Sequence, residues 1–144
     1  MSAPKQNRRQ ARIQAAQQLY GREMRGALPP GAEEQPGPLL AGDELQPFAT
    51  ELLDGAIARL PEIDKLLGAA LQNWDLRRLG AVDRAILRGA VAEMLIHPDI
   101  PAAVTINEAI EIARDLASSD SARFANGVLD RVRKEIGRDA HTTN

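Results

Sequence analysis

The segment PAAVTINEAIEIA, residues 101–113, has the clearest helical pattern of the chain. Its apolar residues recur every three or four positions, which is the spacing of one face of an α-helix. Thr105 and Glu108 stand three residues apart, as in a capping box, so we expect this helix to begin after Thr105. A second segment, DSARFANGVLD at 120–130, repeats the helical spacing and follows Ser118, a residue type that caps helices well. The C-terminal third therefore predicts two consecutive amphipathic helices.

Working outward, the same spacing predicts further helices. Pro47 and Pro61 stand where proline is favoured, at the first position of two of them, and we place Trp74 on the apolar face of the helix that Pro61 opens. Another helix is expected over about 82–96, and an N-terminal one over about 5–25. Between them, residues 26–46 hold four prolines, four glycines and four acidic residues, so we expect an acidic loop there.

Composition bounds the fold class. The 144 residues are 44% hydrophobic but only 3% aromatic, so the core must consist of Ala, Leu, Ile and Val, as in close-packed helices. We expect an all-α fold, a compact single-domain bundle of about seven helices over residues 1–144. The chain has no cysteine, which excludes disulfides and thiolate metal sites and fits a cytoplasmic protein. No apolar run is long enough to span a membrane.

Charge is unevenly distributed along the chain. Residues 1–22 hold five basic residues and no acidic one, although the whole chain has a net charge of −2. Such a local basic patch predicts a polyanionic partner, although an unpaired, solvated helix terminus would also explain it. Arg8, Arg9 and Arg12 fall on one side of the N-terminal helix. Because cations are not buried unpaired, we expect the first two turns of this helix to project beyond the bundle.

Residues that could carry enzymatic chemistry are scarce. The two histidines, His97 and His141, have no neighbours at the spacing of a catalytic triad or a metal site. Glu108 and Glu111 are explained by a solvated acidic helix face. We find no phosphate-binding or dinucleotide-binding glycine motif. The sequence therefore predicts no catalytic residue, no metal and no cofactor, and a protein that is not an enzyme.

Several residues of the last predicted helix are candidates for RNA contact. Phe124 lies at the margin of the apolar face, where an aromatic ring can stack on a single-stranded base, or can simply complete the edge of the core. Arg123 is adjacent, and Arg131 shares the side of Phe124 two turns later. Asp120 and Ser121 stand at the helix start, where they could position a phosphate or a base edge, although helix capping alone explains both.

Two further segments are LGAVDRAILR at 79–88 and the N-terminal RRQAR at 8–12, which leads to Tyr20. Together with the two C-terminal segments, they resemble the NusB family of bacterial transcription antitermination factors. The resemblance covers nearly the whole chain, apart from residues 26–46 and the C-terminal end. It implies an all-helical protein that binds the single-stranded boxA element of ribosomal RNA transcripts together with NusE, a small-subunit ribosomal protein. The pair would join other Nus factors on RNA polymerase and let transcription read through terminators.

Carried over motif by motif, the resemblance implies two sets of site residues. The RNA-binding set is Arg8, Arg9, Arg12, Asp120, Ser121, Arg123, Phe124 and Arg131, and the NusE-facing set is Tyr20, Leu79, Asp83 and Arg84. Some relatives self-associate through the NusE-facing surface, so a homodimer stays open. Two other functions also stay open: a protein-interaction module whose basic helix contacts an acidic protein surface, and the targeting domain of a ribosomal RNA methyltransferase.

Overall fold

The computed structural model describes residues 7–26, 28, 44–72 and 74–137, and in these residues the chain is all-helical, without a strand. Most of the predicted acidic loop, together with Lys5 and His141, lies outside this part of the chain. The elements are α1 (Arg8–Met24), α2 (Pro47–Ala58), α3 (Leu60–Ala70), the 3-10 helix η1 (Leu76–Arg78), α4 (Ala81–Ile96), α5 (Ala102–Leu116) and α6 (Ser119–Glu135). The prediction of an all-α bundle of about seven helices is therefore confirmed.

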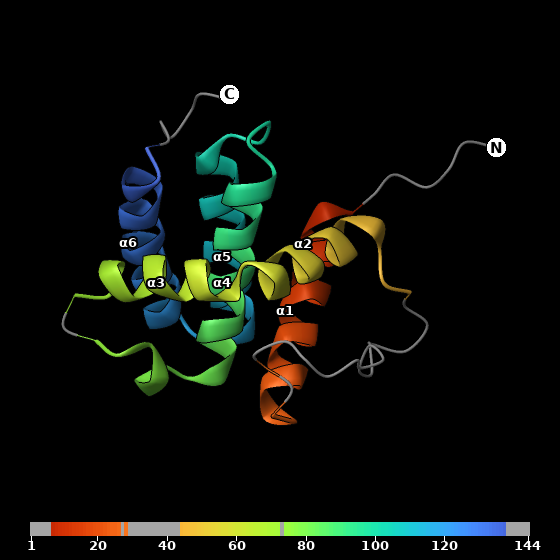
Figure 1. Cartoon of the computed structure of the whole chain (residues 1–144), viewed down its shortest axis with the longest axis horizontal. Coiled ribbons are helices and arrows are strands. Elements are labelled where there is room, and N and C mark those ends of the chain that lie inside the picture. Colours follow the sequence, from red (N-terminus) through yellow and green to blue (C-terminus); the bar gives the residue numbers. More distant parts are fainter. Residues whose placement is uncertain (1–6, 27, 29–43, 73, 138–144) are drawn as a thin grey trace.

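Helix α4 is the centre of the bundle, since it packs against all five other α-helices. Helices α5 and α6 lie against each other on one side of it, and α1 and α2 form a pair on the other (Figure 1). A large apolar cluster surrounds α4, and a smaller one fills the space between α1 and α2, with Phe48 as its largest side chain. Small residues allow these close approaches: a Cβ atom on Gly55 of α2 would come within 2.9 Å of Ile96 Cδ1 on α4.

The helix ends follow the chain's capping residues. Before α6, the Ser118 hydroxyl oxygen accepts a hydrogen bond from the Ser121 backbone N–H at 3.0 Å. Gly137 follows α6 with a φ of 78°, the left-handed conformation that commonly ends a helix. Pro47 opens α2, and Pro61 lies in the first turn of α3. The predictions for Ser118, Gly137 and Pro47 are confirmed, whereas Pro61 is the second residue of its helix rather than the first.

The predicted start of α5 is wrong. The helix begins at Ala102, directly after Pro101, so Thr105 is not a cap but lies inside the helix. Its side chain is buried, and its hydroxyl donates a hydrogen bond to Glu93 Oε2 on α4 at 2.6 Å. Proline favours helix starts because its φ is already helical, and the buried carboxylate provides the partner for the threonine hydroxyl.

The expectation that the first two turns of α1 project beyond the bundle is also wrong. Ala11 and Ala15 are fully buried, and Arg12 is only 8% exposed. The Arg12 guanidinium donates two hydrogen bonds to the Glu93 carboxylate, at 2.7 and 2.8 Å. A cation can be buried when it is paired and hydrogen-bonded, and Glu93, 81 positions away, provides that pairing.

Arg12→Met should lower the free energy of unfolding by about 3–5 kcal/mol, because the Glu93 charge would remain buried without its partner. Replacing both residues by methionine should recover most of this loss. Urea denaturation of the two variants and the unmodified chain measures the difference.

Arg9→Met is the matched control, because the Arg9 side chain is about half exposed and surface ion pairs contribute little to stability. A single Arg12→Met variant as stable as Arg9→Met would contradict a structural role for the buried pair.

Candidate nucleic-acid interface

The two N-terminal arginines that remain at the surface have partners within the protein. The Arg8 guanidinium lies 4.9 Å from the centre of the Phe48 ring, a cation–π distance. The Arg9 guanidinium donates to Glu108 Oε2 on α5 at 2.6 and 2.9 Å, and this hydrogen bond, with the Glu108 charge, raises the pKa of Arg9. The interpretation of Glu108 as part of a solvated acidic face is therefore wrong. A phosphate that binds Arg9 must compete with Glu108.

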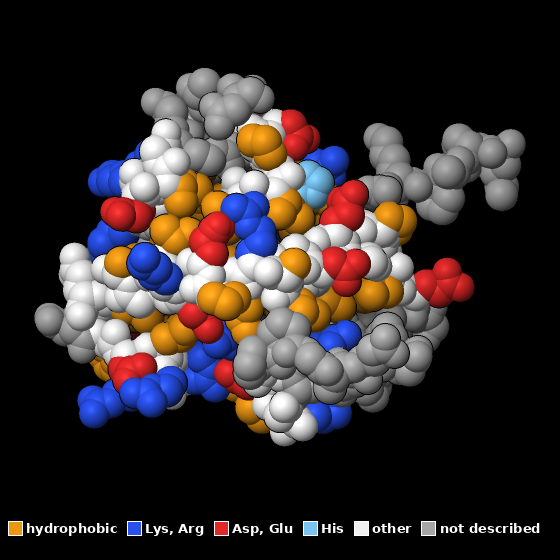
Figure 2. Space-filling model, in the orientation of Figure 1, with side chains coloured by type: hydrophobic (Ala, Val, Ile, Leu, Met, Phe, Trp, Pro, Cys, Tyr) orange, Lys and Arg blue, Asp and Glu red, His pale blue; other side chains and the backbone are white. Residues whose placement is uncertain are grey.

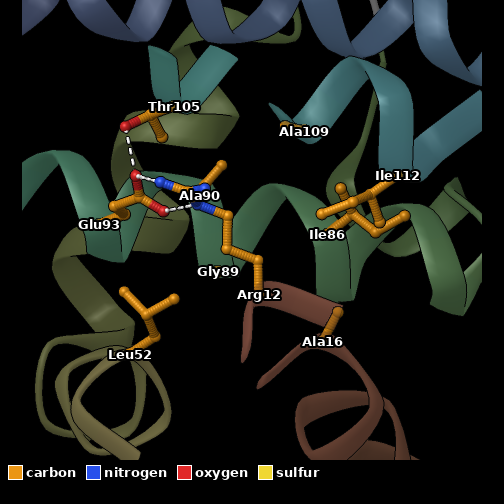
Figure 3. Close-up of a pocket in the computed structure, with 10 residues that line it drawn as sticks. All are labelled: Arg12, Ala16, Leu52, Ile86, Gly89, Ala90, Glu93, Thr105, Ala109 and Ile112. Carbon is orange, nitrogen blue, oxygen red and sulfur yellow. Dashed lines mark hydrogen bonds and ion pairs between the residues drawn. The ribbon is translucent and has the colours of Figure 1, made fainter. Parts of the chain in front are cut away.

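Arg12, the third predicted RNA-binding arginine, points into the protein instead. Figure 3 shows its guanidinium meeting Glu93, which Thr105 approaches from the other side. Glu108 adds a second negative charge, with Oε1 3.5 Å from the guanidinium. A cavity of about 20 Å³ lies beside the pair, between mainly apolar side chains. Arg12 thus joins α1 to α4, and its geometry gives no support to a phosphate contact.

Five of the other predicted residues meet at a hollow away from Arg12, namely Leu79, Asp83, Asp120, Ser121 and Phe124. Its lining comes from the segment around η1, the start of α4 and the first turns of α6. We call it the Trp74–Phe124 hollow; it measures about 300 Å³, and its lining residues are Trp74, Arg78, Leu79, Gly80, Asp83, Asp120, Ser121 and Phe124. It brings together members of both predicted sets, the RNA-binding one and the NusE-facing one.

Two aromatic rings form the walls of the hollow. Phe124 is partly buried, which confirms its predicted place at the margin of the core. Trp74 is 55% exposed, so its predicted place on the buried face of a helix is wrong. Helix α3 ends at Ala70, and Trp74 lies beyond it, with its ring centre 6.1 Å from that of Phe124 at an interplanar angle of 79°. This is an edge-to-face pair.

Arg78, an exposed residue of η1, lines the same hollow and is not among the residues predicted from the sequence. Within the described part of the chain its guanidinium forms no ion pair, whereas the neighbouring Arg77 is held by Asp75 at 3.0 Å. A signal was present, because an Arg-Arg pair and a tryptophan in a break between helices are unusual in a packed segment. Trp74 continues the helical spacing of the preceding helix, and for that reason it was assigned to that helix and not to the break.

The start of α6 is exposed and internally paired. Asp120 forms an ion pair with Arg123, one turn later, and both side chains are largely exposed. Ser121 accepts a hydrogen bond from the Ser118 hydroxyl. Asp120 and Ser121 line the Trp74–Phe124 hollow, whereas Arg131 does not: its Nε donates to the carbonyl of Ala70, the last residue of α3, at 2.7 Å.

The predicted NusE-facing residues differ in their availability. Tyr20 is 40% exposed, while Leu79 and Asp83 are half-buried at the edge of the hollow. The Arg84 guanidinium already has hydrogen-bond partners within the protein. It donates to the Glu23 carboxylate on α1 at 2.7 and 2.9 Å and to the carbonyl of Leu79, so it ties α1 to the segment that carries the hollow.

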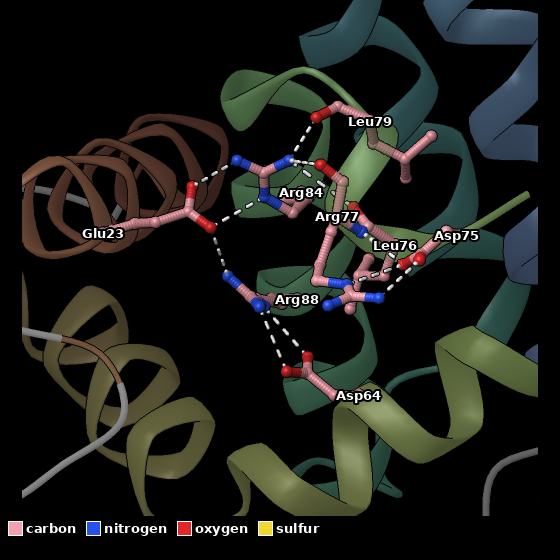
Figure 4. A network of polar contacts seen from close by, with 8 residues as sticks. All are labelled: Glu23, Asp64, Asp75, Leu76, Arg77, Leu79, Arg84 and Arg88. Carbon is pink, nitrogen blue, oxygen red and sulfur yellow. Dashed lines mark hydrogen bonds and ion pairs between the residues drawn. The ribbon is translucent and has the colours of Figure 1, made fainter. Parts of the chain in front are cut away.

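Figure 4 shows that Glu23 and Arg84 belong to a larger network. Arg88 donates to Glu23 at 3.1 Å and to both carboxylate oxygens of Asp64 on α3, at 2.9 and 3.0 Å. Burial acts most strongly on Glu23 and raises its pKa, but the hydrogen bonds and charges of Arg84 and Arg88 together outweigh it. The pKa of Glu23 is therefore lowered from its usual value of 4.5. The network joins α1, α3 and α4.

The part of the chain that the structure describes gives no support to metal binding or to a membrane-spanning helix. It contains no group of three or more His, Cys, Asp or Glu side chains that could hold a metal ion. None of its helices is both long and apolar enough to cross a membrane. On the face drawn in Figure 2, basic and acidic side chains are interspersed rather than gathered into one basic field.

Comparison with known proteins agrees with this geometry. A model of the NusB family matches residues 9–134. The transcription antitermination protein NusB of Bacillus velezensis is 40% identical over 129 residues, which cover 90% of this chain and 97% of that protein.

Solved structures show the same fold. NusB of T. maritima is 32% identical with a TM-score of 0.70, and the alignment covers 94% of each chain. A crystal structure of the antitermination factors NusB and NusE in complex with dsRNA contains a chain that is 26% identical with a TM-score of 0.72. That match covers 89% of this chain and 96% of the other.

Glu23→Gln should destabilise the protein at pH 7, and the deficit should shrink as the pH falls. A carboxylate whose pKa is lowered on folding stabilises the native state above its unfolded pKa, here about 4.5, and this contribution disappears as the pH falls through the lower folded value. Urea denaturation of both proteins between pH 7 and pH 3.5 measures the difference.

Asp54→Asn, on the exposed side of α2, corrects for the loss of one negative charge. A deficit in Glu23→Gln that stays constant over the whole range would show that the lost stability comes from packing rather than from the ionised carboxylate.

Proposed function

The chain belongs to the NusB family, and on that premise we propose that it binds single-stranded boxA RNA of ribosomal RNA transcripts together with NusE. It is a transcription antitermination factor and not an enzyme. We further propose that it acts in the cytoplasm as a single domain of residues 1–144, where other Nus factors join it on RNA polymerase. Transcription then reads through terminators.

The observation that carries the RNA-binding proposal is the Trp74–Phe124 hollow. Single-stranded RNA is recognised through bases that leave the stack and lie against aromatic rings. The hollow offers an exposed indole and a partly buried phenyl ring side by side, with the exposed Arg78 at its rim. Stacking on such rings is worth about 1–3 kcal/mol per base, so a single base here would contribute substantially to affinity.

Phosphate contacts would come from the surface arginines. Arg8 and Arg78 are exposed and form no carboxylate pair with another described residue. Arg9 can contribute if the RNA displaces Glu108, and Arg123 if it displaces Asp120. Because each of these exchanges replaces one anionic partner by another, we expect the gain in affinity per arginine to be modest. Arg12 and Arg131 have structural partners, and we assign them no RNA contact.

NusE would bind beside the hollow, over the exposed end of α1. Tyr20 and Met24 are 40% and 54% exposed there, and covering two large apolar side chains favours association. Leu79 and Asp83 would then lie at the border between NusE and the RNA. A second copy of this chain is the alternative occupant of the same surface, and a homodimer would then compete with NusE.

The chain should bind a boxA-like RNA more tightly than a scrambled strand of the same length, and NusE should increase the preference. Fluorescence anisotropy of the labelled strands, titrated with this protein with and without NusE, measures both effects. Affinity should fall at higher salt, because phosphate contacts release counterions. Equal affinity for the two strands with NusE present would contradict the proposal and favour a protein-interaction module with a generic basic patch.

Phe124→Ala and Trp74→Ala should each weaken binding of the boxA-like strand about fivefold to 150-fold, which corresponds to the loss of about 1–3 kcal/mol of stacking. Binding of NusE, measured by calorimetry without RNA, should change little. Val104→Ala, another exposed apolar residue at the start of α5, serves as the control. A loss that is equal in all three variants would show a general effect of apolar truncation instead.

A further inference from the structure

We infer that the Trp74–Phe124 hollow receives one guanine base of the bound RNA, an inference that rests on the proposed function. It adds to that function the identity of the base and the groups that select it. Three features of the lining carry the inference: the two perpendicular rings, a half-buried carboxylate without a partner, and an exposed guanidinium.

The two rings fit a flat ligand. With an interplanar angle of 79° and ring centres 6.1 Å apart, a planar group that stacks on one ring meets the other at right angles. A nucleobase is planar and has a π-face of its own, and base–aromatic stacking is tolerant of base identity. The two rings therefore provide affinity for any base, and selectivity for one base must come from the polar groups of the lining.

The carboxylate of Asp83 has no hydrogen bond or ion pair with any other residue that the structure describes, although the residue is half-buried and lines the hollow. The other carboxylate of the lining, that of Asp120, is paired with Arg123. A carboxylate accepts hydrogen bonds and donates none, and hydrogen bonds to an ionised acceptor are stronger than those between neutral groups. Asp83 therefore favours a ligand that presents hydrogen-bond donors.

Guanine presents the best complement among the four RNA bases. Its Watson–Crick edge carries two adjacent donors, N1–H and the N2 amino group, which match the two oxygens of one carboxylate. Adenine and cytosine each offer a single amino group, and uracil one N–H between two carbonyl oxygens that a carboxylate repels. The remaining acceptors of guanine, O6 and N7, are those that arginine recognises in pairs, and Arg78 lies in the same lining.

The test uses twelve-nucleotide RNAs of uridine with one central position that is guanosine, inosine, adenosine, cytidine or uridine. Inosine keeps N1–H and O6 but lacks the N2 amino group, so it removes one donor alone. Trp74 is the only tryptophan of the chain, and quenching of its emission reports a base in the hollow directly. NusE is kept out of this titration so that the signal belongs to this chain.

We expect the guanosine strand to quench Trp74 and to bind about tenfold more tightly than the inosine strand, with the uridine strand weakest. In Asp83→Asn the preference for guanosine over inosine should fall to about twofold or less, while Asp54→Asn should keep the full preference. Asp54 is an exposed aspartate on α2, outside the proposed interface.

The series of bases on the unmodified chain needs no variant, so the inference stays testable even if Asp83→Asn folds poorly. Equal quenching and affinity for all five strands would overturn the guanine site while leaving RNA binding intact. A guanosine preference that survives in a folded Asp83→Asn would overturn the role of Asp83. If the boxA-like strand does not bind even with NusE present, that result contradicts the proposed function and the guanine site as well.

Discussion

The buried ion pair between Arg12 and Glu93 determines how three helices of the bundle pack together. Removing two charges from water is expensive, and only close geometry with further hydrogen bonds can offset that cost. Here two hydrogen bonds from Arg12 and one from Thr105 converge on one carboxylate, so α1, α4 and α5 must meet at a fixed register. That register decides which side of α1 is buried and leaves Arg8 and Arg9 at the surface.

A second electrostatic network places the candidate site. Arg84 holds Glu23 on α1 and the carbonyl of Leu79, and the segment it holds carries Trp74 and Arg78. The hollow is assembled from the segment around η1, the start of α4 and the start of α6, and α6 is distant in sequence from the other two. Since Arg84 contacts both α1 and this segment, the surface proposed for NusE and the surface proposed for RNA share one support.

Pairing within the fold also changes the meaning of the basic N-terminus. Its charges are concentrated in the sequence, but Glu93 neutralises Arg12 and Glu108 neutralises Arg9. The proposed interface would attract RNA less through a broad positive field than through specific stacking and hydrogen bonding, which would suit single-stranded RNA with exposed bases. A bound strand would have to displace Glu108 to reach Arg9 and Asp120 to reach Arg123, and this requirement would favour a partner that fits the hollow over any polyanion.

The helical fold, most helix bounds and the marginal place of Phe124 can be predicted from the sequence, because they depend on local spacing, caps and prolines that act within a few residues. The sequence also carried the family resemblance that the comparisons confirmed. Three other features follow from the packing of the helices: Arg12 is buried, Thr105 is not a cap, and Trp74 is exposed beside Phe124. Each of these involves a partner on another element, 12 positions away for Thr105 and 81 for Arg12, and helical spacing contains no information about which carboxylate or ring of another element will face a given side chain.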